Sequence, residues 1–380
     1  MSSGPRLNLS GGGAGEADRR RAAPISTGGP ELTTKKPQQQ RSPVIDDVAR
    51  LAGVSVPTVS RVLTGAAKVS EAKREAVMNA ITLLKYRPSA AARSVASRRS
   101  SVIAVIAGNT SRYGYAETIR GVEEAARARG YIVSITVVDS TEDDDVERAV
   151  SLVVGQDLAG IVALKFDPPG VAALQRLPDH IPTVAISGVR ETHVPQAVLD
   201  EASAAAELTD FLLNLGHGTV HHVRVPPSRR EDGRTAGWRR ALRKAGAVIP
   251  PAFDASWQPE SGRAIGQALA KDESVTAVFC GNDEIAMGVI RGLADEGLRT
   301  PEDVSVVGFD NHPLSGLWTP SLTTAHQDFF GLGQRGFELL MAQVSGEPGA
   351  RRFSSERPAL VIRASAAAPS SGRGRSDLTA

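Results

Sequence analysis

The chain of 380 residues contains one cysteine and few aromatic residues. Because Cys280 has no second cysteine to pair with, the fold cannot rest on internal disulfides, and a cysteine-based metal site is excluded. Aromatic residues make up 4% of the chain, so its core must be built mainly from Val, Leu, Ile and Ala. A hydrophobic content of 41% still predicts globular structure, in more than one domain at this length.

Several kinds of segment are also missing. No apolar run approaches the roughly 18–20 residues that a membrane span needs. The N-terminal MSSGPRLNLSGGGAGEADRRR lacks the apolar centre of a secretory signal. There is no GxSxG motif, no Walker loop and no paired-acid constellation. The sequence therefore predicts a cytoplasmic protein that is not an enzyme and uses no cofactor.

Charge is distributed unevenly. Residues 1–100 hold 17 Lys and Arg against 7 Asp and Glu, whereas residues 101–380 hold 27 against 35. This asymmetry predicts that only the first part meets a polyanion. Residues 1–43, rich in Gly, Ser, Pro, Gln and Arg, are typical of a disordered tail. A basic tail that merely keeps the protein in solution is the less favoured alternative.

Residues 44–88 have the spacing of three short helices. Apolar residues predict a first helix over 45–52, ended by Gly53, and a second from Ser55 that has a proline in its first turn. A third helix is expected over 70–84. Two short helices around a glycine turn, braced by a third, describe a helix-turn-helix domain.

Two segments, DVARLAGVSVPTVSRVLTG and KVSEAKREAVMNAITLLKYRPSAAARS, closely resemble the DNA-binding region of the lactose-repressor (LacI) family. The resemblance implies that the second helix enters the major groove and meets base edges with Val56, Pro57 and Arg61. It implies phosphate contacts for Ser55, Thr58, Ser60 and Thr64. Arg61 suits bidentate pairing with guanine. Small polar residues that simply cap and solvate a helix remain an alternative, above all for Ser60.

Residues 89–100 contain an Ala-rich run that favours helix but is too short to be stable alone. It is therefore expected to fold on DNA contact. In the family, paired hinge helices enter the minor groove and a Leu from each wedges a base step. This chain has Val95 there, a smaller wedge. The hinge residues implied to contact DNA are Ala92, Arg93 and Val95, and an ordinary linker is the alternative.

From Ser101 onward, buried strands alternate with helices, which predicts a parallel sheet. The series resumes after a helix at 202–215. Two doubly wound α/β halves in tandem are therefore expected over residues 101–365, with a disordered tail at 366–380. Such halves resemble a two-lobed periplasmic sugar-binding-protein fold, the usual sensor of this family. Ligands of such sheets bind outside the carboxyl ends of the strands, here between the halves.

Several segments are similar to ligand-reaching segments of the family. GRTAGW, AVFCGNDEIAMG, VSVVGFDNHP and TTAHQDF point to Arg234, Asn282, Asp283, Asp310 and Phe329. Strand ends and the second half add Asn109, Tyr113, Ser187 and Trp257. Paired polar groups with an aromatic wall suit the hydroxyls and the apolar face of a sugar.

Other interpretations of these residues remain open. Asp310 is also typical of a cap on the next segment, and Trp257 of the core or the surface. Arg229 and Arg230 are typical of loop charges unless the effector is anionic. HxxxHH at 217–222 has metal-like spacing. However, TVHHVRV is typical of a strand, whose adjacent histidines point to opposite faces, so no metal site is predicted.

The resemblance implies a homodimeric transcriptional regulator, usually a repressor, that binds a pseudo-palindromic site in double-stranded DNA. A small-molecule effector, expected to be a sugar, would control DNA binding in either direction by changing cleft closure and hinge order. One alternative is a transport-type sugar-binding protein, opposed by the missing signal and the attached helical head. The other is a hydrolase or kinase, opposed by the missing motifs.

Overall fold

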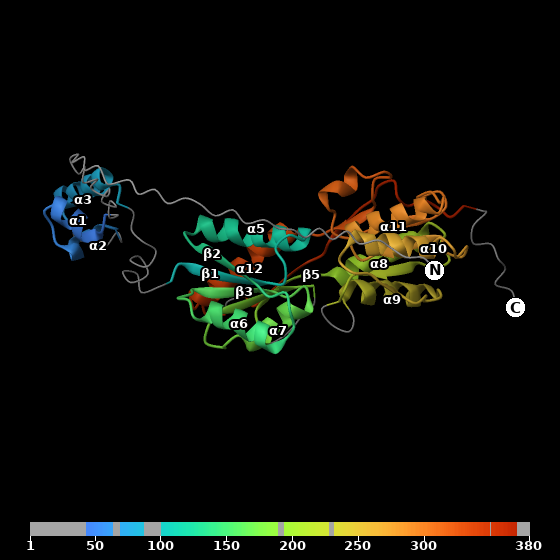
Figure 1. The fold of residues 1–380 in the computed structure, drawn as a ribbon, viewed down its shortest axis with the longest axis horizontal. Helices are drawn as coiled ribbons and strands as arrows, with labels where there is room; N and C mark the ends of the chain where they lie inside the picture. Colours follow the sequence, from blue (N-terminus) through green and yellow to red (C-terminus); the bar gives the residue numbers. More distant parts are fainter. Residues whose placement is uncertain are drawn as a thin grey trace, which may run out of the picture. The chain divides into compact units, whose positions relative to one another are not determined.

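Figure 1 shows the computed structural model of the chain, which describes residues 43–63, 69–86, 100–188, 194–227, 232–349 and 351–370. The chain forms two compact units, one with the three N-terminal helices and one with the strands. Among the described residues, none of the helices combines the length and apolarity that crossing a membrane requires.

The N-terminal unit, called the head below, consists of α1 (Ile45–Leu51), α2 (Val56–Leu63) and α3 (Glu71–Leu84). Gly53, between α1 and α2, has a φ of 63°, a left-handed conformation that glycine adopts at little cost. The core draws on all three helices and holds Val48, Ala49, Val59, Val62, Val77, Ala80 and Tyr86. The predicted helix-turn-helix is confirmed.

Helix α1 begins without a capping side chain. Val44 stands before its first residue and makes no side-chain cap hydrogen bond. Instead, the backbone N–H of Val44 donates to the carboxylate of Asp47, in the first turn, at 3.0 Å. Asp47 thus supplies one half of a capping box and places negative charge at the positive end of the helix.

The first lobe of the second unit is a parallel sheet between two pairs of helices. Its strands are, in spatial order, β11 (Phe353–Glu356), β5 (Gln196–Leu199), β4 (Thr183–Ser187), β3 (Gly160–Leu164), β1 (Val102–Ala107) and β2 (Ile132–Val137). One face is covered by α5 (Tyr113–Ala128) and α12 (Phe329–Val344), the other by α6 (Asp143–Val154) and α7 (Pro168–Arg176). In β1, Val105 packs toward the first pair and Ile106 toward the second, because strand side chains alternate.

The second lobe repeats this layering. Its parallel sheet has the order β7 (Phe253–Asp254), β6 (His221–Arg224), β8 (Ala277–Cys280) and β9 (Ser305–Val307). An antiparallel pair, β10 (Thr324–His326) and β12 (Ala359–Val361), lies beside it. The helices are α8 (Glu201–Asn214) and α9 (Gly233–Ala245) on one face, and α10 (Pro259–Leu269) and α11 (Asp283–Asp295) on the other.

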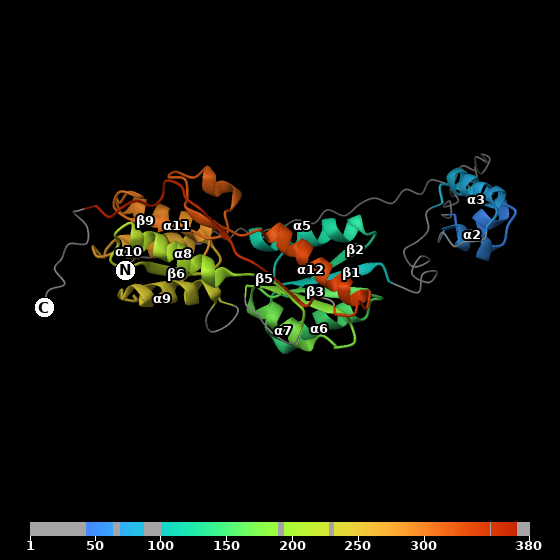
Figure 2. The same cartoon turned by 180° about the vertical axis from the view of Figure 1, so that it is seen from behind.

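The chain passes between the lobes three times: from β5 to α8, from β10 to α12, and from β11 to β12. Figure 2 shows α12 beside α5 over the first-lobe sheet, although it comes late in the chain. The two expected α/β lobes are confirmed, but they do not simply follow one another along the chain. The lobes interlace because β11 pairs in parallel with β5 and returns the chain to the first sheet.

Two boundaries also differ from expectation. The run TIRGVEEAARARG has the apolar pattern of a helix from Thr118, but α5 already begins at Tyr113. Residues 366–370, assigned to a disordered tail, belong to the described part. The carbonyl of Ala367 accepts a hydrogen bond from Oγ of Ser305 at 2.9 Å, and Ala366 packs against the second-lobe core.

The histidines of HxxxHH lie in the second lobe, where two of them make packing contacts or hydrogen bonds. His222 is fully buried, stacks on Phe279 with ring centroids 4.8 Å apart, and hydrogen-bonds Thr235 at 3.0 Å. His217 hydrogen-bonds Thr276 at 2.9 Å. Within the described ranges, no group of three His, Cys, Asp or Glu is arranged to hold a metal ion.

Candidate functional site

Helix α2 has one buried and one exposed side. Val59 and Val62 are in the head core, whereas Pro57 and Arg61, four residues apart, are exposed on the other side. Val56 packs partly against the core. Of the three residues expected to face base edges, Pro57 and Arg61 are therefore the exposed ones.

The polar residues expected to bind phosphate lie just before α2 and within it. Ser55 is exposed, and its hydroxyl hydrogen-bonds that of Thr58 at 3.0 Å, while Ser60 is half-buried. Four further residues expected to contact DNA fall outside the described residues: Thr64, Ala92, Arg93 and Val95.

A cavity between the two lobes encloses about 740 Å³, including the part open to solvent. Six of the nine residues expected to bind an effector line it: Tyr113, Arg234, Trp257, Asn282, Asp310 and Phe329. They come from both lobes, because the carboxyl ends of both parallel sheets face this cavity. The cavity therefore lies between the lobes, where the sequence predicts the effector site.

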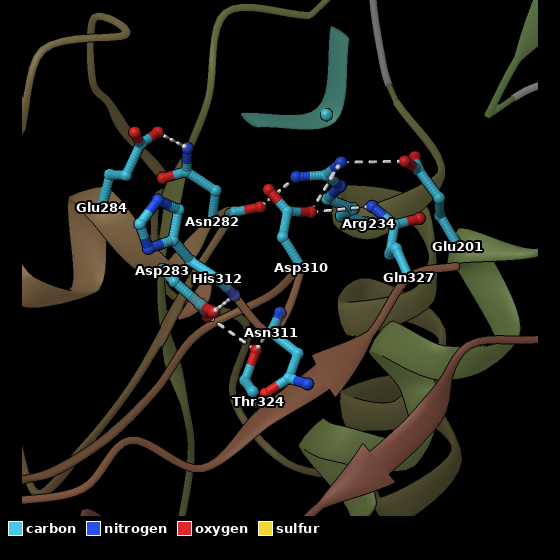
Figure 3. A network of polar contacts seen from close by, with 12 residues as sticks. Glu201, Arg234, Asn282, Asp283, Glu284, Asp310, Asn311, His312, Thr324 and Gln327 are labelled. Carbon is cyan, nitrogen blue, oxygen red and sulfur yellow. Dashed lines mark hydrogen bonds and ion pairs between the residues drawn. The ribbon is translucent and has the colours of Figure 1, made fainter. Parts of the chain in front are cut away.

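A buried ion-pair network is the polar centre of the cavity (Figure 3). Arg234, in the first turn of α9, donates to Glu201 at 2.9 Å and lies 3.5 Å from Asp310. Its other terminal nitrogen donates to the carbonyl of Gly281. Burial alone would lower the pKa of Arg234, but the two acids raise it overall, so the guanidinium stays charged.

Asp310 is held in an uncommon conformation. Its φ is 112°, which costs a non-glycine residue free energy, and its N–H donates to the carbonyl of Ala325 at 2.8 Å. Its carboxylate accepts from Nε2 of Gln327 at 2.7 Å. Gln327 lies in the segment that passes from β10 to α12, so the site is directly bonded to a crossing between lobes.

Asp310 also makes stability depend on pH. Burial raises its pKa to about 7, against the opposing effect of Arg234. Because the folded-state pKa lies above the unfolded value, the proton favours the folded state. Its contribution is complete at about pH 4 and is lost as pH rises through 7.

Asp310→Asn mimics the protonated acid, so its stability should not depend on this titration. We expect the free energy of unfolding of the variant, minus that of the parent chain, to increase from pH 5 to pH 8. The gain should be roughly 2–4 kcal/mol. Urea unfolding at the two pH values measures it. An equal difference between variant and parent at both pH values would contradict the raised pKa.

The three remaining expected residues do not line the cavity. The Asp283 carboxylate accepts from the N–H of His312 at 2.7 Å and from the hydroxyls of Ser315 and Thr324 at 2.6 Å each (Figure 3). With three donors, it fixes the loop after β9. The Asn109 side chain accepts from backbone N–H groups of the turn before α5. Ser187 is buried and accepts from Gln196 at 3.1 Å.

Aromatic residues form the apolar walls. Tyr113 contacts Phe329 edge-on, with ring centroids 5.9 Å apart, and also contacts His312 of the second lobe at 4.9 Å. Arg112 of the first lobe lies over the ring of Trp257 of the second, 4.6 Å from its centroid. Cation–π and edge contacts thus bridge the lobes beside the polar network.

Several lining residues were not anticipated. They include Arg112, Lys165, Phe166, Glu201, Val225, Asp232 and Glu284. Lys165 and Phe166 directly follow β3, and Val225 directly follows β6. The rule that ligands bind beyond the carboxyl ends of parallel strands applies to these positions and was the available signal.

Together the cavity offers paired donors and acceptors beside aromatic faces. Arg234 supplies donors, the carboxylates of Glu201 and Asp310 supply acceptors, and the Asn282 side chain caps α11 through Ile285 N–H at 2.9 Å. Such a set can bind a polyhydroxylated molecule in a defined orientation.

Comparisons with known proteins agree with both parts of the chain. Residues 44–89 match the bacterial regulatory proteins of the lacI family, and residues 209–366 match the periplasmic binding protein-like domain. The chain is 34% identical over 334 residues to the HTH-type transcriptional repressor PurR of Erwinia tasmaniensis, covering 85% of this chain and 96% of the relative. It is 32% identical over 311 residues to catabolite control protein A of Priestia megaterium, covering 80% and 93%.

Solved structures show the same likeness. The lac repressor dimer bound to operator and the anti-inducer ONPF has a TM-score of 0.79 and 26% identity, covering 86% of this chain and 100% of that chain. The complex of the transcriptional regulator CelR with cellobiose has a TM-score of 0.63 and 28% identity, covering 85% and 99%. The chain belongs to the LacI family and is a DNA-binding transcriptional repressor with an effector-binding domain, not an enzyme.

Proposed function

We propose that this repressor binds a pseudo-palindromic operator as a homodimer and is controlled by a sugar bound between its lobes. The observation that carries the proposal is the network of Arg234, Glu201 and Asp310 inside a cavity with aromatic walls. Paired charged donors and acceptors bind adjacent hydroxyls, and an aromatic face packs on the apolar side of a sugar ring. CelR, a relative in structure, binds cellobiose.

On the DNA side, Arg61 reads a base edge and Pro57 makes apolar contact in the major groove. Ser55, Thr58, Ser60 and Thr64 bind phosphates and fix the register. The hinge residues Ala92, Arg93 and Val95 contact DNA, with Val95 as the wedge in the minor groove and Arg93 at the flanking phosphates. The exposed position of Arg61 on α2 supports this assignment.

Effector control of DNA binding depends on the three segments of the chain that connect the lobes. An effector that contacts Asp310 acts on Gln327, which is bonded to it and lies in the segment between β10 and α12. A change in lobe closure then alters the geometry that the first lobe imposes on the hinge. A coupling free energy of roughly 1–3 kcal/mol per site is typical of such linkage.

The edge strand β2 supports self-association. It ends the first-lobe sheet, and its side chains Ile132, Ile135 and Val137 are each about half exposed, at 50%, 46% and 45%. An exposed apolar edge strand is a liability in a monomer and is usually covered. The lac repressor of similar structure is a dimer on its operator.

The double substitution Ile135→Asp and Val137→Asp is expected to convert the dimer to a monomer, because it would bury four carboxylates in a two-fold interface. Light scattering after size exclusion measures the mass. Val248→Asp, at an apolar side chain 68% exposed on the second lobe, is the matched control and should stay dimeric. A dimeric double variant would place the interface elsewhere.

A gel shift on the upstream region of the gene that encodes the chain tests the function directly. The proposal predicts a specific complex whose stability changes, in either direction, when a sugar from a mono- and disaccharide panel is added. A specific complex that no sugar alters would refute sugar control but leave DNA binding in place. The absence of any specific complex would refute the proposal.

A further inference from the structure

Lys165 is a charged residue of the cavity that the proposed function does not use. It follows β3 directly, lines the cavity and is 2% exposed. Its backbone is firmly placed: the N–H donates to the carbonyl of Ile186 at 2.8 Å, which extends the pairing of β3 with β4. A Cβ on Gly170, in the first turn of α7, would come within 2.2 Å of the Leu164 carbonyl, so α7 closes tightly behind this residue.

The two walls of the cavity carry opposite charge. Among the described residues that line it, the charged side chains of the first lobe are Arg112 and Lys165. Those of the second lobe are Glu201, Asp232, Glu284 and Asp310, together with Arg234. Arg112 is half-buried and lies over Trp257, whereas Lys165 is the deeply buried basic residue among the described residues of the first-lobe wall.

The neighbours of Lys165 set the character of this wall. Phe166 contacts Tyr115 and Phe329 edge-on, with ring centroids 5.1 and 6.3 Å apart. Burial, and then the nearby Asp167, raise the pKa of the Tyr115 phenol, so its hydroxyl keeps its proton. The Asp167 carboxylate accepts from the N–H of Gly170 at 3.0 Å and so caps the start of α7.

A buried ammonium group is a donor only, and its hydrogen bonds to anionic oxygens are about twice as strong as those to neutral ones. The carboxylates of the opposite wall are acceptors, which bind hydroxyl hydrogens and repel anions. A ligand with hydroxyls at one end and an anionic group at the other is therefore oriented by both walls at once. A neutral sugar uses only one of them fully.

We propose, as an extension of the proposed function, that the effector is an acidic carbohydrate whose carboxylate or phosphate group binds Lys165 while its hydroxyls bind Arg234 and Asp310. Lys165 is then the residue that selects acidic over neutral sugars. The aromatic side chains of Tyr113, Phe166 and Phe329 pack on the ring between the two ends.

The test compares matched sugars on the full-length chain by titration calorimetry: D-glucose, D-glucuronate and D-glucose 6-phosphate, and the corresponding galactose series. At least one acidic member should bind about 10- to 100-fold more tightly than its neutral parent. Comparison of the glucuronate with the 6-phosphate shows whether the preferred anionic group is a carboxylate or a phosphate. Neutral members that bind as tightly as the acidic ones, or an absence of binding by all acidic members, would overturn the proposal.

Variants assign the effect to one side chain. Lys165→Met should remove the preference for the acidic member, and Lys165→Arg should retain most of it. Lys244→Met, at a lysine on α9 whose side chain is 76% exposed, removes the same charge outside the cavity and should keep the full preference. A preference that survives Lys165→Met in a folded variant would contradict the role of Lys165. Operator release by neutral sugars alone would leave the repressor function intact and refute only the acidic effector.

Discussion

Arg61→Ala is expected to abolish most of the sequence preference of DNA binding while leaving nonspecific binding in place. Arg61 is exposed on α2, whereas Val56 is partly engaged in the head core and Pro57 has no donor in its side chain. A bidentate pair with guanine contributes about 1–3 kcal/mol of discrimination, so a dimer with two copies loses roughly 2–6 kcal/mol. This corresponds to a fall of about 30-fold to 20,000-fold in the ratio of specific to nonspecific affinity.

Competition gel shifts with operator and scrambled DNA measure that ratio. Arg50→Ala is the matched control: it removes the same charge from the head, at a side chain that is 77% exposed and paired with Asp47 on α1. It should weaken operator and scrambled DNA alike, because phosphate attraction carries no sequence information. An Arg61→Ala variant that kept its specificity ratio would show that α2 does not read the site through this residue.

Arg234→Met is expected to destabilise the effector-binding unit by roughly 3–5 kcal/mol, because it leaves Glu201 and Asp310 as buried carboxylates without their cation. The substitution should also remove the response of operator binding to any effector, because the cavity no longer has the guanidinium at its polar centre. Urea unfolding of the full-length chain measures the first effect. Gel shifts at a temperature where the variant is folded measure the second.

Two companion variants make the result interpretable. Glu201→Gln combined with Arg234→Met should recover part of the lost stability, because one unpaired charge is removed with its partner. Arg263→Met breaks the ion pair with Asp295 at a side chain that is 51% exposed, so its cost should stay below about 1 kcal/mol. Equal costs for Arg234→Met and Arg263→Met would mean that burial does not strengthen the Arg234 network.

Local pattern was enough to predict most single elements. The alternation of Val105 and Ile106 in β1, or of Phe279 and Cys280 in β8, reflects burial on both faces of a sheet. Burial of this kind produces the continuous apolar runs that indicate a parallel strand. The turn at Gly53 and the apolar spacing of α1 likewise depend only on near neighbours.

The interlacing of the lobes was not predictable in this way. β11 has the sequence FSSE, without an apolar run, and it joins the first-lobe sheet only because β5 offers a parallel edge about 157 residues earlier. Pairing over such a distance leaves no periodic signal within either segment. The same holds for α12, whose helical pattern does not say which lobe it covers.

Resemblance pointed to several residues that line the cavity, but it did not separate these from a motif residue that lies outside it. Asp283 and Asp310 have equally recognisable motifs, yet only Asp310 lines the cavity, because Asp283 is turned to three donors of the loop after β9. Lys165 belongs to no recognised segment, although its place after β3 puts it in the cavity. A motif match indicates which residue types are present, whereas the order of the strands determines which side chains lie together in the cavity.

Selection of sheared genomic DNA by the purified full-length chain, followed by sequencing of the bound fragments, tests the central claim most directly. We expect enriched fragments to share an inverted repeat whose half-sites contain a guanine read by Arg61. Their recovery should change when the bound complex is washed with the effector identified by calorimetry. Fragments without a shared motif, with or without that effector, would contradict the account of this chain as an effector-controlled, operator-binding repressor.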